Sequence, residues 1–338
     1  MGKTEELAQM LCEKLKKNKF RIGDRFPSEY ELSQEFQVNN KTANKAVTML
    51  VSQGLLRRGK RGEGTFVKQL SLFPEMLVGY IGTILHPFYA QIYDGFQHEA
   101  QNKNCLPISL SPQFHSLNTL IPQLNNTLIA GYISHGYGLL NSLNKPVIYL
   151  EDYIDNTCMP DYVTTDSAIG SRLMAESLLN KGHRDIVIFC TSLSNPDRIA
   201  GLAETFQQAG ISDIAQRIFT TSRQDFSFHC SQLLTEAFKR FPSLTAIATV
   251  SDNIAEEIIK TLEKRNIPWQ GKISITGFGN VKGISDRYLI ATLDQHPALL
   301  GAEAFHALQR KIQTGETQQI RIEPELINNH FIFPPALK

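Results

Sequence analysis

A basic, glycine-rich loop at residues 59–64 is the first feature of this chain whose residue types could do chemistry. Its three glycines allow tight turning and a close approach of the backbone to another surface. Lys60 and Arg61 lie at the tip, where they could contact phosphates or enter the minor groove of DNA. A solvated basic hairpin in an ordinary α+β fold would carry the same residues, so the loop alone does not decide between the two.

Charge is divided unevenly along the chain, in a way that favours contact with a polyanion. Residues 1–70 carry 14 Lys and Arg against 8 Asp and Glu, whereas residues 71–338 carry 20 against 25. A basic module attached to a more acidic body is typical of a chain in which one domain binds nucleic acid. The net charge of +1 for all 338 residues hides this division.

Two predicted helices precede the loop and would position it. Ser28 and Glu31 form a capping-box pattern, in which each side chain satisfies a backbone N–H of the other residue, at the start of a short helix. Asn39 and Asn40 are N-cap candidates for a second helix that runs through Ser52. Two helices joined by a short turn form a helix-turn-helix unit.

A hairpin follows, with predicted strands at 55–58 and 65–68 on either side of the glycine-rich loop. The order of two helices and a hairpin predicts a winged helix-turn-helix domain over residues 1–68. We assign residues 69–76 to a linker and residues 77–338 to a second domain.

Residues 77–338 alternate short apolar runs with amphipathic stretches. The predicted strands lie at 77–81, 106–110, 129–133, 147–150, 186–190, 217–220, 245–249, 273–277 and 289–293. The predicted helices lie near 88–102, 116–126, 167–181, 197–209, 228–240, 252–265 and 297–312. This alternation predicts an α/β fold of two lobes, with parallel sheets and helices on both faces. A cleft between such lobes, at the carboxyl ends of the strands, is where a small ligand binds.

The first 68 residues resemble the GntR-type winged helix almost end to end. The matching residues are Pro27-Ser28-Glu29, Leu32, Phe36, Val38, Thr42, Ala46, Gly54-Leu55-Leu56 and Gly64-Thr65-Phe66-Val67. In that family the second helix enters the major groove and the wing enters the minor groove. By position, the resemblance implies DNA contacts from Ser28, Tyr30, Asn39, Asn40, Lys41, Thr42, Asn44, Lys45, Lys60, Arg61, Gly62 and Gly64.

Three of these positions depart from the family pattern, because arginine is common there where this chain has Tyr30, Asn40 and Asn44. Asparagine pairs with adenine through N6 and N7, whereas arginine prefers guanine O6 and N7. We therefore predict an operator that depends more on adenine. The alternatives for the asparagines are helix capping by Asn39 or Asn40 and simple solvation of Asn44.

Residues 76–338 resemble the LacI/GalR-type effector domain, which has a periplasmic-binding-protein-like fold. The matches include Val78-Gly79-Tyr80-Ile81, His86-Pro87-Phe88-Tyr89, Lys145-Pro146-Val147-Ile148, Gly182-His183-Arg184-Asp185, Asp197-Arg198-Ile199-Ala200-Gly201, Ser251-Asp252 and Glu323-Pro324-Glu325-Leu326. A GntR-type head on such a body resembles the arabinose-repressor kind of chimera. The resemblance implies effector contacts from Phe88, Tyr89, His135, Glu151, Arg198, Phe226, Asp252, Asn280 and Gln295.

Several of these residues have a structural alternative. The planar guanidinium of Arg198 suits the vicinal hydroxyls of a sugar, or it could form a salt bridge to Asp197 or Glu204. Asp252 could accept two hydroxyl protons or only cap the next helix. Phe226 could stack on a sugar ring or pack against Phe228. Phe88 and Tyr89 could line the cleft or pack in the core.

Two departures from the LacI/GalR pattern matter. The family often has Asp-Asp where this chain has Gly279-Asn280, and the loss of a carboxylate removes a strong hydroxyl acceptor. The effector is therefore expected to differ from the common neutral sugars, or to make fewer contacts on that side. Pro74 and the lack of a basic helical pattern in the linker argue against the minor-groove hinge helix of that family.

Other function classes find no support. The five cysteines are scattered and lack C-x-x-C spacing, which argues against a disulfide framework or a zinc site. The chain has no signal-peptide pattern and no apolar run near the ~20 residues that cross a bilayer, so we expect a cytoplasmic protein. No hydrolase, metalloprotease or phosphate-loop motif is present, and we predict a non-enzyme without cofactor or metal.

Together these patterns predict a homodimeric transcription regulator, a repressor of carbohydrate-utilisation genes. Its affinity for double-stranded operator DNA would change when a small sugar-like effector closes the cleft. The alternative is a cytoplasmic sugar-binding protein or sugar-converting enzyme with an incidental basic domain.

Overall fold

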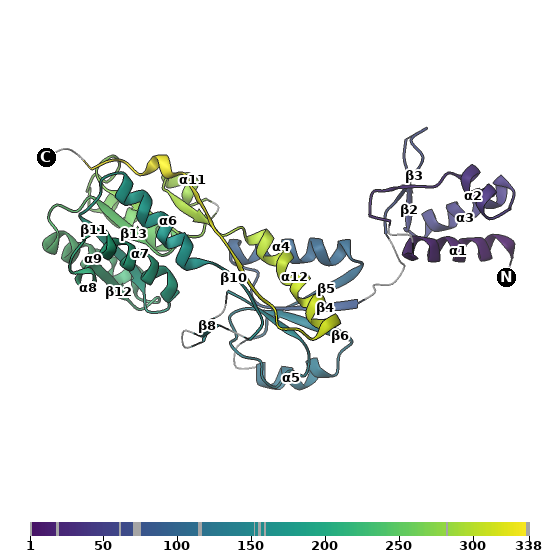
Figure 1. Ribbon diagram of the computed structural model, residues 1–338, viewed down its shortest axis with the longest axis horizontal. Coiled ribbons are helices and arrows are strands. Elements are labelled where there is room, and N and C mark those ends of the chain that lie inside the picture. The colour runs from purple at the N-terminus through teal and green to yellow at the C-terminus, as the bar shows by residue number, and fades with distance from the viewer. Residues whose placement is uncertain are drawn as a thin grey trace.

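The computed structural model describes residues 2–17, 20–60, 62–69, 76–113, 117–151, 153–154, 157–158, 160–281 and 283–335. These residues form a small N-terminal head and two α/β lobes (Figure 1). The two lobes confirm the predicted parallel α/β architecture.

The head packs three helices against a small antiparallel sheet of order β1-β3-β2. Its elements are α1 (Lys3–Lys17), β1 (Arg25–Phe26), α2 (Glu29–Glu35), α3 (Asn40–Ser52), β2 (Leu56–Arg58) and β3 (Thr65–Val67). One apolar side chain from each helix, Leu11, Leu32 and Leu50, is fully buried in a common core. The sequence did not predict β1, whose two residues are too few to show a strand pattern.

The helix starts in the head are held by side chains. The Ser28 hydroxyl accepts from the backbone N–H of Glu31 at 3.3 Å, and the Glu31 carboxylate accepts from the backbone N–H of Ser28 at 2.7 Å. This is the predicted capping box, and such a cap typically contributes about 1 kcal/mol. Asn39 caps α3, so the helix begins at Asn40.

The first lobe has a six-stranded sheet of order β16-β10-β7-β6-β4-β5, in which every pair is parallel. Its elements are β4 (Met76–Ile81), α4 (Pro87–Asn102), β5 (Cys105–Leu110), α5 (Leu117–Asn125), β6 (Ile129–Ser134), β7 (Val147–Leu150), β10 (Tyr162–Thr165), α12 (Pro297–Thr314) and β16 (Gln319–Ile322). A short hairpin, β8 (Tyr153–Ile154) and β9 (Thr157–Cys158), follows β7. Helices α4 and α12 share one core with this sheet, and α5 contributes to a second core.

The second lobe has a four-stranded parallel sheet of order β12-β11-β13-β14. Its elements are α6 (Ser167–Asn180), β11 (Ile186–Thr191), α7 (Pro196–Gln208), α8 (Ile214–Arg217), β12 (Ile218–Thr221), α9 (Phe226–Arg240), β13 (Ala246–Thr249), α10 (Asp252–Lys264), β14 (Ser274–Thr276), α11 (Ser285–Tyr288), β15 (Thr292–Asp294), β17 (Glu325–Ile327) and the 3-10 turn Asn329–Phe331. Strands β15 and β17 pair antiparallel beside this sheet. Its apolar residues form one continuous core.

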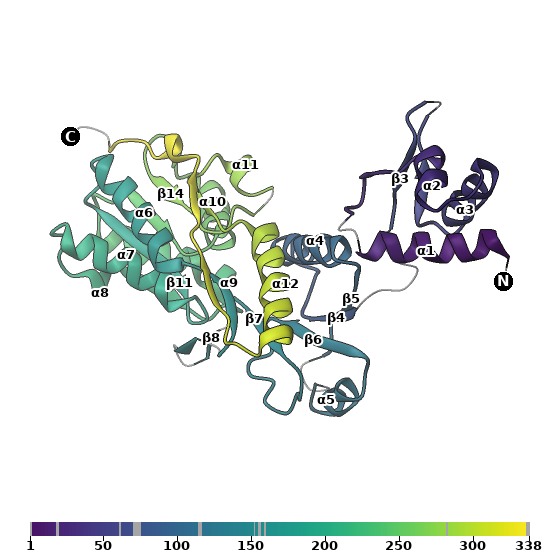
Figure 2. The same cartoon turned by 45° about the vertical axis from the view of Figure 1, so that its right-hand side comes forward.

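The chain passes between the lobes three times (Figure 2). It crosses from β10 to α6, returns from β15 to α12, and crosses again from β16 to β17. The first passage leads straight into α6, where Asp166 caps the helix through the backbone N–H of Ile169 at 3.1 Å. These passages bring the carboxyl ends of the strands of both lobes to one cleft.

Candidate functional site

One exposed face of α3 gathers most of the predicted DNA-contacting residues. Asn40, Lys41, Asn44 and Lys45 are exposed, and the opposite face, which includes Ala43, is buried. The polar face therefore lies outward at helical spacing, as a helix that enters a major groove requires. Whether each side chain contacts a base stays a prediction.

Asn39 and Thr42 are tied to each other at the start of this helix. The Asn39 side-chain oxygen accepts from the backbone N–H of Thr42 at 2.7 Å and from its hydroxyl at 2.9 Å. Of the two asparagines that could cap α3, Asn39 does so and Asn40 does not. The Asn39 oxygen is thus already engaged, and Thr42 is half-buried.

A chain of polar contacts that sequence reasoning missed connects α3 to the wing. The Thr48 hydroxyl lies 3.2 Å from the Asn44 side-chain oxygen and accepts from Arg58 at 3.3 Å. Arg58, on β2, also forms an ion pair with Glu29 of α2. Asn44 therefore has a partner rather than being simply solvated. The i, i+4 spacing of Asn44 and Thr48 was the signal in the sequence.

The two predicted residues near α2 differ in what they offer. Tyr30 is 65% exposed and points away from the core. The Ser28 hydroxyl is engaged in the capping box and also donates to the Glu31 carboxylate at 2.8 Å. Hydrogen bonds from the Ser28 backbone and side chain lower the pKa of Glu31.

The wing loop has the backbone conformation that its glycines allow. Gly62 and Gly64 have φ of +90° and +96°, in the left-handed region that favours glycine. The Lys60 backbone N–H donates to the Glu63 carboxylate at 2.7 Å, and Lys60 itself is exposed. Arg61, the other predicted residue at the tip, lies outside the described residues.

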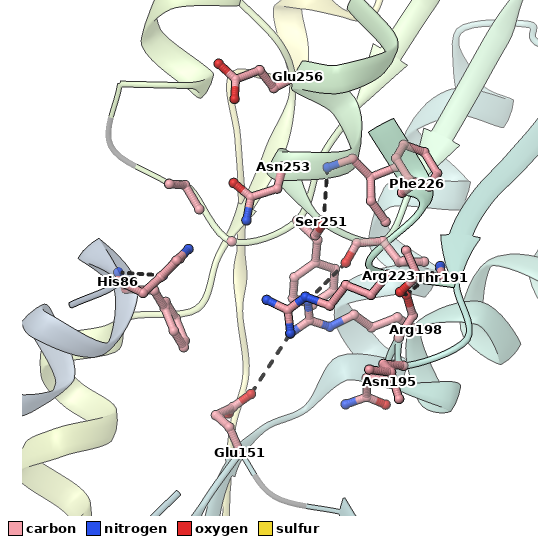
Figure 3. A pocket seen from close by; sticks show the side chains of 18 of the residues that line it. His86, Glu151, Thr191, Asn195, Arg198, Arg223, Phe226, Ser251, Asn253 and Glu256 are labelled. Carbon is pink, nitrogen blue, oxygen red and sulfur yellow. Dashed lines mark hydrogen bonds and ion pairs between the residues drawn. The ribbon is translucent and has the colours of Figure 1, made fainter. Parts of the chain in front are cut away.

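A cleft of about 1050 Å³ lies between the lobes (Figure 3). Six of the nine predicted effector residues line it, and they come from both lobes. These six are Phe88, Tyr89, Glu151, Arg198, Phe226 and Gln295. The other three, His135, Asp252 and Asn280, are not among the residues that line it.

Arg198, at the start of α7, connects the parts of the cleft. It donates to the Ser167 hydroxyl at 3.3 Å, to the Val250 carbonyl at 3.0 Å and to the Gln295 side-chain oxygen. Its guanidinium carbon lies 3.7 Å from the centroid of the Phe278 ring, a stacked cation–π contact. Across the cleft, the Glu151 carboxylate of the first lobe is 3.9 Å from Arg198. Arg198 therefore joins both lobes and the β15–α12 passage.

Glu151 is placed by the end of β7. Its φ of +52° turns the chain sharply, and its carboxylate accepts from the hydroxyls of Thr164 and Thr165, at 3.3 and 2.8 Å, and from the backbone N–H of Thr165. This carboxylate is thus largely occupied by the neighbouring strand β10 before any ligand enters.

The prediction that Asp252 contacts the effector is not supported by its position. Its side chain is fully buried, and its two oxygens accept from the Thr292 hydroxyl and the Val281 backbone N–H, each at 2.6 Å. Burial raises the pKa of Asp252 to about 6. The capping alternative is also wrong, because Ser251 is the N-cap of α10. Asp252 instead ties α10 to β15.

Asn280 and His135 likewise serve neighbours rather than the cleft surface. The Asn280 amide donates to Asp294 at 3.0 Å and accepts from the Ser285 hydroxyl at 2.9 Å. His135 is buried, stacks on Tyr89 with ring centroids 3.9 Å apart and lies 3.2 Å from the Thr83 carbonyl. Burial lowers the pKa of His135, which fits a neutral ring that supports Tyr89.

The three aromatic residues predicted to bind the effector line the cleft but are also packed against the protein. Phe226 lines the cleft yet is only 4% exposed, so it belongs to the core of the second lobe as well. Its suggested packing partner, Phe228, is 84% exposed and is not buried against it. Phe88 is buried and Tyr89 half-buried, and both reach the cleft from the first turn of α4.

The structure adds cleft residues that the sequence did not single out, among them His86, Asn195, Arg223, Ser251 and Asn253. His86, Asn195 and Ser251 are N-caps of α4, α7 and α10. The pattern of a cap residue directly before a helix that follows a strand could have identified these three.

Comparison with known proteins agrees with this architecture. Residues 3–67 match the family described as bacterial regulatory proteins, gntR family, and residues 175–329 match the periplasmic binding protein-like domain. The arabinose metabolism transcriptional repressor of Halalkalibacterium halodurans is 24% identical over 340 residues, covering 90% of this chain and 89% of that protein. Its counterpart from Geobacillus stearothermophilus is 22% identical over 349 residues, covering 95% of each.

The chain is a transcriptional regulator that joins a GntR-type head to a periplasmic-binding-protein-like domain. Both resemblances inferred from the sequence are thereby confirmed. A solved structure of the transcriptional regulator CelR in complex with cellobiose superposes on the regulator with a TM-score of 0.65 at 15% identity, covering 89% of this chain and 98% of that one. This likeness supports the fold.

Over the described residues, no helix is both long and apolar enough to span a bilayer. The same part of the chain holds no group of three or more His, Cys, Asp or Glu side chains that could bind a metal ion.

Proposed function

We propose that this regulator is a homodimeric repressor of sugar-utilisation genes, released from its operator when a small sugar-like effector closes the cleft. The observation that carries the proposal is the combination of an exposed polar face on α3 and a cleft spanned by Arg198 in one chain. The names of the two full-length relatives, both repressors of arabinose metabolism, support the sugar assignment. We infer that it acts in the cytoplasm as a regulator and not as an enzyme.

Each part of the chain has its own proposed role. Residues 1–68 bind DNA, residues 69–76 link, and residues 77–338 bind effector and dimerise. Asn40 and the neighbouring lysines contact the major groove, and Lys60 with Arg61 contact the minor groove beside it. Because Asn40 replaces an arginine that is common in the family, the operator depends more on adenine.

Arg198 couples ligand binding to the relative position of the two lobes. It joins Glu151 of the first lobe to Gln295 of the passage between lobes, so a ligand that enters there replaces or tightens contacts of both lobes. A ligand can shift the open and closed forms only by its difference in affinity for them. Closure of a dimeric body changes the spacing of the two heads, and with it the fit to two half-sites.

The test begins with selection of bound sequences from fragmented genomic DNA by the purified full chain, which yields the operator. Operator binding is then measured with and without pentoses, hexoses and disaccharides. We expect at least one sugar or sugar derivative to weaken binding tenfold or more. Arg198→Ala should lose this response and keep operator binding, and Arg172→Ala, an exposed arginine on α6, should keep both.

Enrichment of no sequence above background would contradict the DNA-binding role. Loss of both operator binding and ligand response in Arg198→Ala would show that Arg198 supports folding instead. A monomer in sedimentation with operator present would contradict the dimer.

A further inference from the structure

Arg223 lines the cleft from the second lobe. It lies in the turn between β12 and α9, and the residue is exposed. Among the described residues, no carboxylate pairs with it. An arginine that faces solvent in an open cleft loses its hydration when the cleft closes, and it then needs an acceptor.

The carboxylates of the cleft already have cationic partners. Glu151 faces Arg198 at 3.9 Å, and Glu256 and Glu257 share Lys260 at 3.1 and 3.6 Å. Among the described residues that line the cleft, Arg223 is therefore an arginine without a carboxylate partner.

A second hydrogen-bond donor reaches the same part of the cleft from the first lobe. His86 caps α4, and its Nδ1 accepts from the backbone N–H of Phe88 at 3.3 Å, which places the proton of the neutral ring on Nε2. Burial, and then the charge of Arg223, lower the pKa of His86, so the ring is neutral near pH 7. His86 and Arg223 extend into the cleft from opposite sides (Figure 3).

Two side chains predicted to bind a neutral sugar are, by contrast, engaged by neighbouring residues. Both Asp252 oxygens hold Thr292 and Val281, and the Asn280 amide is bound on both sides by its neighbours. A cleft whose described lining presents an arginine without a carboxylate partner suits a ligand that brings oxygens of its own.

We propose that the effector carries an anionic group, a carboxylate or a phosphate ester, which Arg223 and His86 bind from the two lobes. The hydroxylated remainder of the effector lies against Arg198 and the aromatic side chains. This inference rests on the proposed effector function of the same cleft. An anion held between the lobes favours the closed form, because each lobe supplies one donor and neither lobe alone supplies both.

The test uses matched sets of probes with the full-length protein. Each set holds a neutral sugar, its phosphate ester and its aldonic acid: glucose, glucose 6-phosphate and gluconate, and arabinose, arabinose 5-phosphate and arabinonate. Inorganic phosphate serves as the control for non-specific anion binding, since the head is basic. Thermal shift identifies binders, because a ligand of the folded form stabilises it, and calorimetry measures their affinities.

We expect a charged member of a set to bind and its neutral parent to bind at least tenfold more weakly. Arg223→Gln should weaken the charged ligand about ten- to a hundredfold, as expected for one charge-assisted contact. His86→Ala should also weaken it, and Arg172→Gln should not. Whether the binder is the ester or the acid then distinguishes phosphate from carboxylate.

Three results would overturn the inference. One is a neutral sugar that binds better than its charged derivatives and changes operator affinity, in which case the effector function stands and only the anionic class fails. Another is anion binding that survives Arg223→Gln, which would place the anion elsewhere. If no probe binds or changes operator affinity, the effector function fails together with this inference.

Discussion

Arg198 and Asp252 show what single residues in the sequence can and cannot reveal. Both follow a strand and lie at the start of a helix, the position where side chains of an α/β lobe meet a ligand. Arg198 reaches the cleft, whereas Asp252 turns inward to Thr292, a residue 40 positions away in the chain. Which acceptors surround a side chain depends on such distant strands, and no local pattern contains that information.

The buried carboxylate of Asp252 has a measurable consequence. Its pKa is raised from 3.8 to about 6, so between these values the folded protein binds more protons than the unfolded chain. Stability contributed by this group is therefore greatest below about pH 4 and falls as the pH rises towards 6, by at most about 1.4 kcal/mol per pH unit. Asp252→Asn lacks this dependence. The free energy of unfolding in urea, followed by the single tryptophan Trp269 in the same core, should show it.

The difference between variant and wild type cancels the titration of other groups. That difference should move in favour of Asp252→Asn between pH 4.5 and 6.5. A constant difference would mean that the carboxylate keeps an ordinary pKa.

Asn40 and Lys41 are adjacent, but their substitutions should weaken DNA binding in different ways. Asn40 is free of the contact that engages the Asn44 oxygen, so it is the asparagine best able to pair with adenine through both amide atoms. Asn40→Ala should cost about 1–3 kcal/mol on the selected operator and relax one base position. Lys41→Ala should weaken binding to every sequence similarly and reduce the salt slope by about one. The selected-sequence profile and a salt titration measure the two effects, and equal profiles for Asn40→Ala and wild type would argue against base contact.

At the scale of elements, regular patterns were predictable, and two neighbouring strands on one side of the first-lobe sheet were not. The strands at 129–134 and 147–150 and the helix at 297–314 lie close to their predicted ranges, because their apolar residues show a clear period. β10 and β16 were missed. Each has four residues, and they pair with each other across more than 150 positions, so neither has a local signal.

The close packing of α4 on α12 depends on two glycines. A Cβ on Gly301 would lie 1.8 Å from the Ile92 carbonyl oxygen, and one on Gly95 would lie 1.9 Å from the Ala298 carbonyl oxygen. Gly301→Ala must push two backbones apart. We expect a net loss of about 1–3 kcal/mol, despite the gain of about 1 kcal/mol in helix propensity.

Denaturant unfolding followed by circular dichroism measures this loss. Gln309→Ala, on the same helix and half-exposed, is the matched control and should change stability by less than about 0.5 kcal/mol. If Gly301→Ala left the free energy of unfolding unchanged, the two helices could move apart without loss of stability.

At the scale of the whole molecule, the head and the body differ in how far their structures could be predicted from the sequence. The head has its own core, so its fold follows from local residues. The body is built from three passages between lobes, and its cleft exists only when all of them are in place. The sequence indicated two lobes through their alternation, but which residues face one another across the cleft emerged only from the complete structure.

The proposed dimer carries two heads, and this should show in the salt dependence of operator binding. A single head neutralises a fixed number of phosphates, and the logarithm of affinity falls with the logarithm of salt by about 0.9 per phosphate. A palindromic operator engages both heads, so its slope should be about twice that of an isolated half-site. Its affinity should exceed that of the half-site by about 10²–10⁴, because the second head binds intramolecularly.

Titration of both DNAs between 50 and 200 mM salt, about the range in which such contacts dominate, tests this. Equal slopes on the two DNAs would mean that only one head of the dimer binds, and closure of the cleft could then not act by changing the spacing between heads.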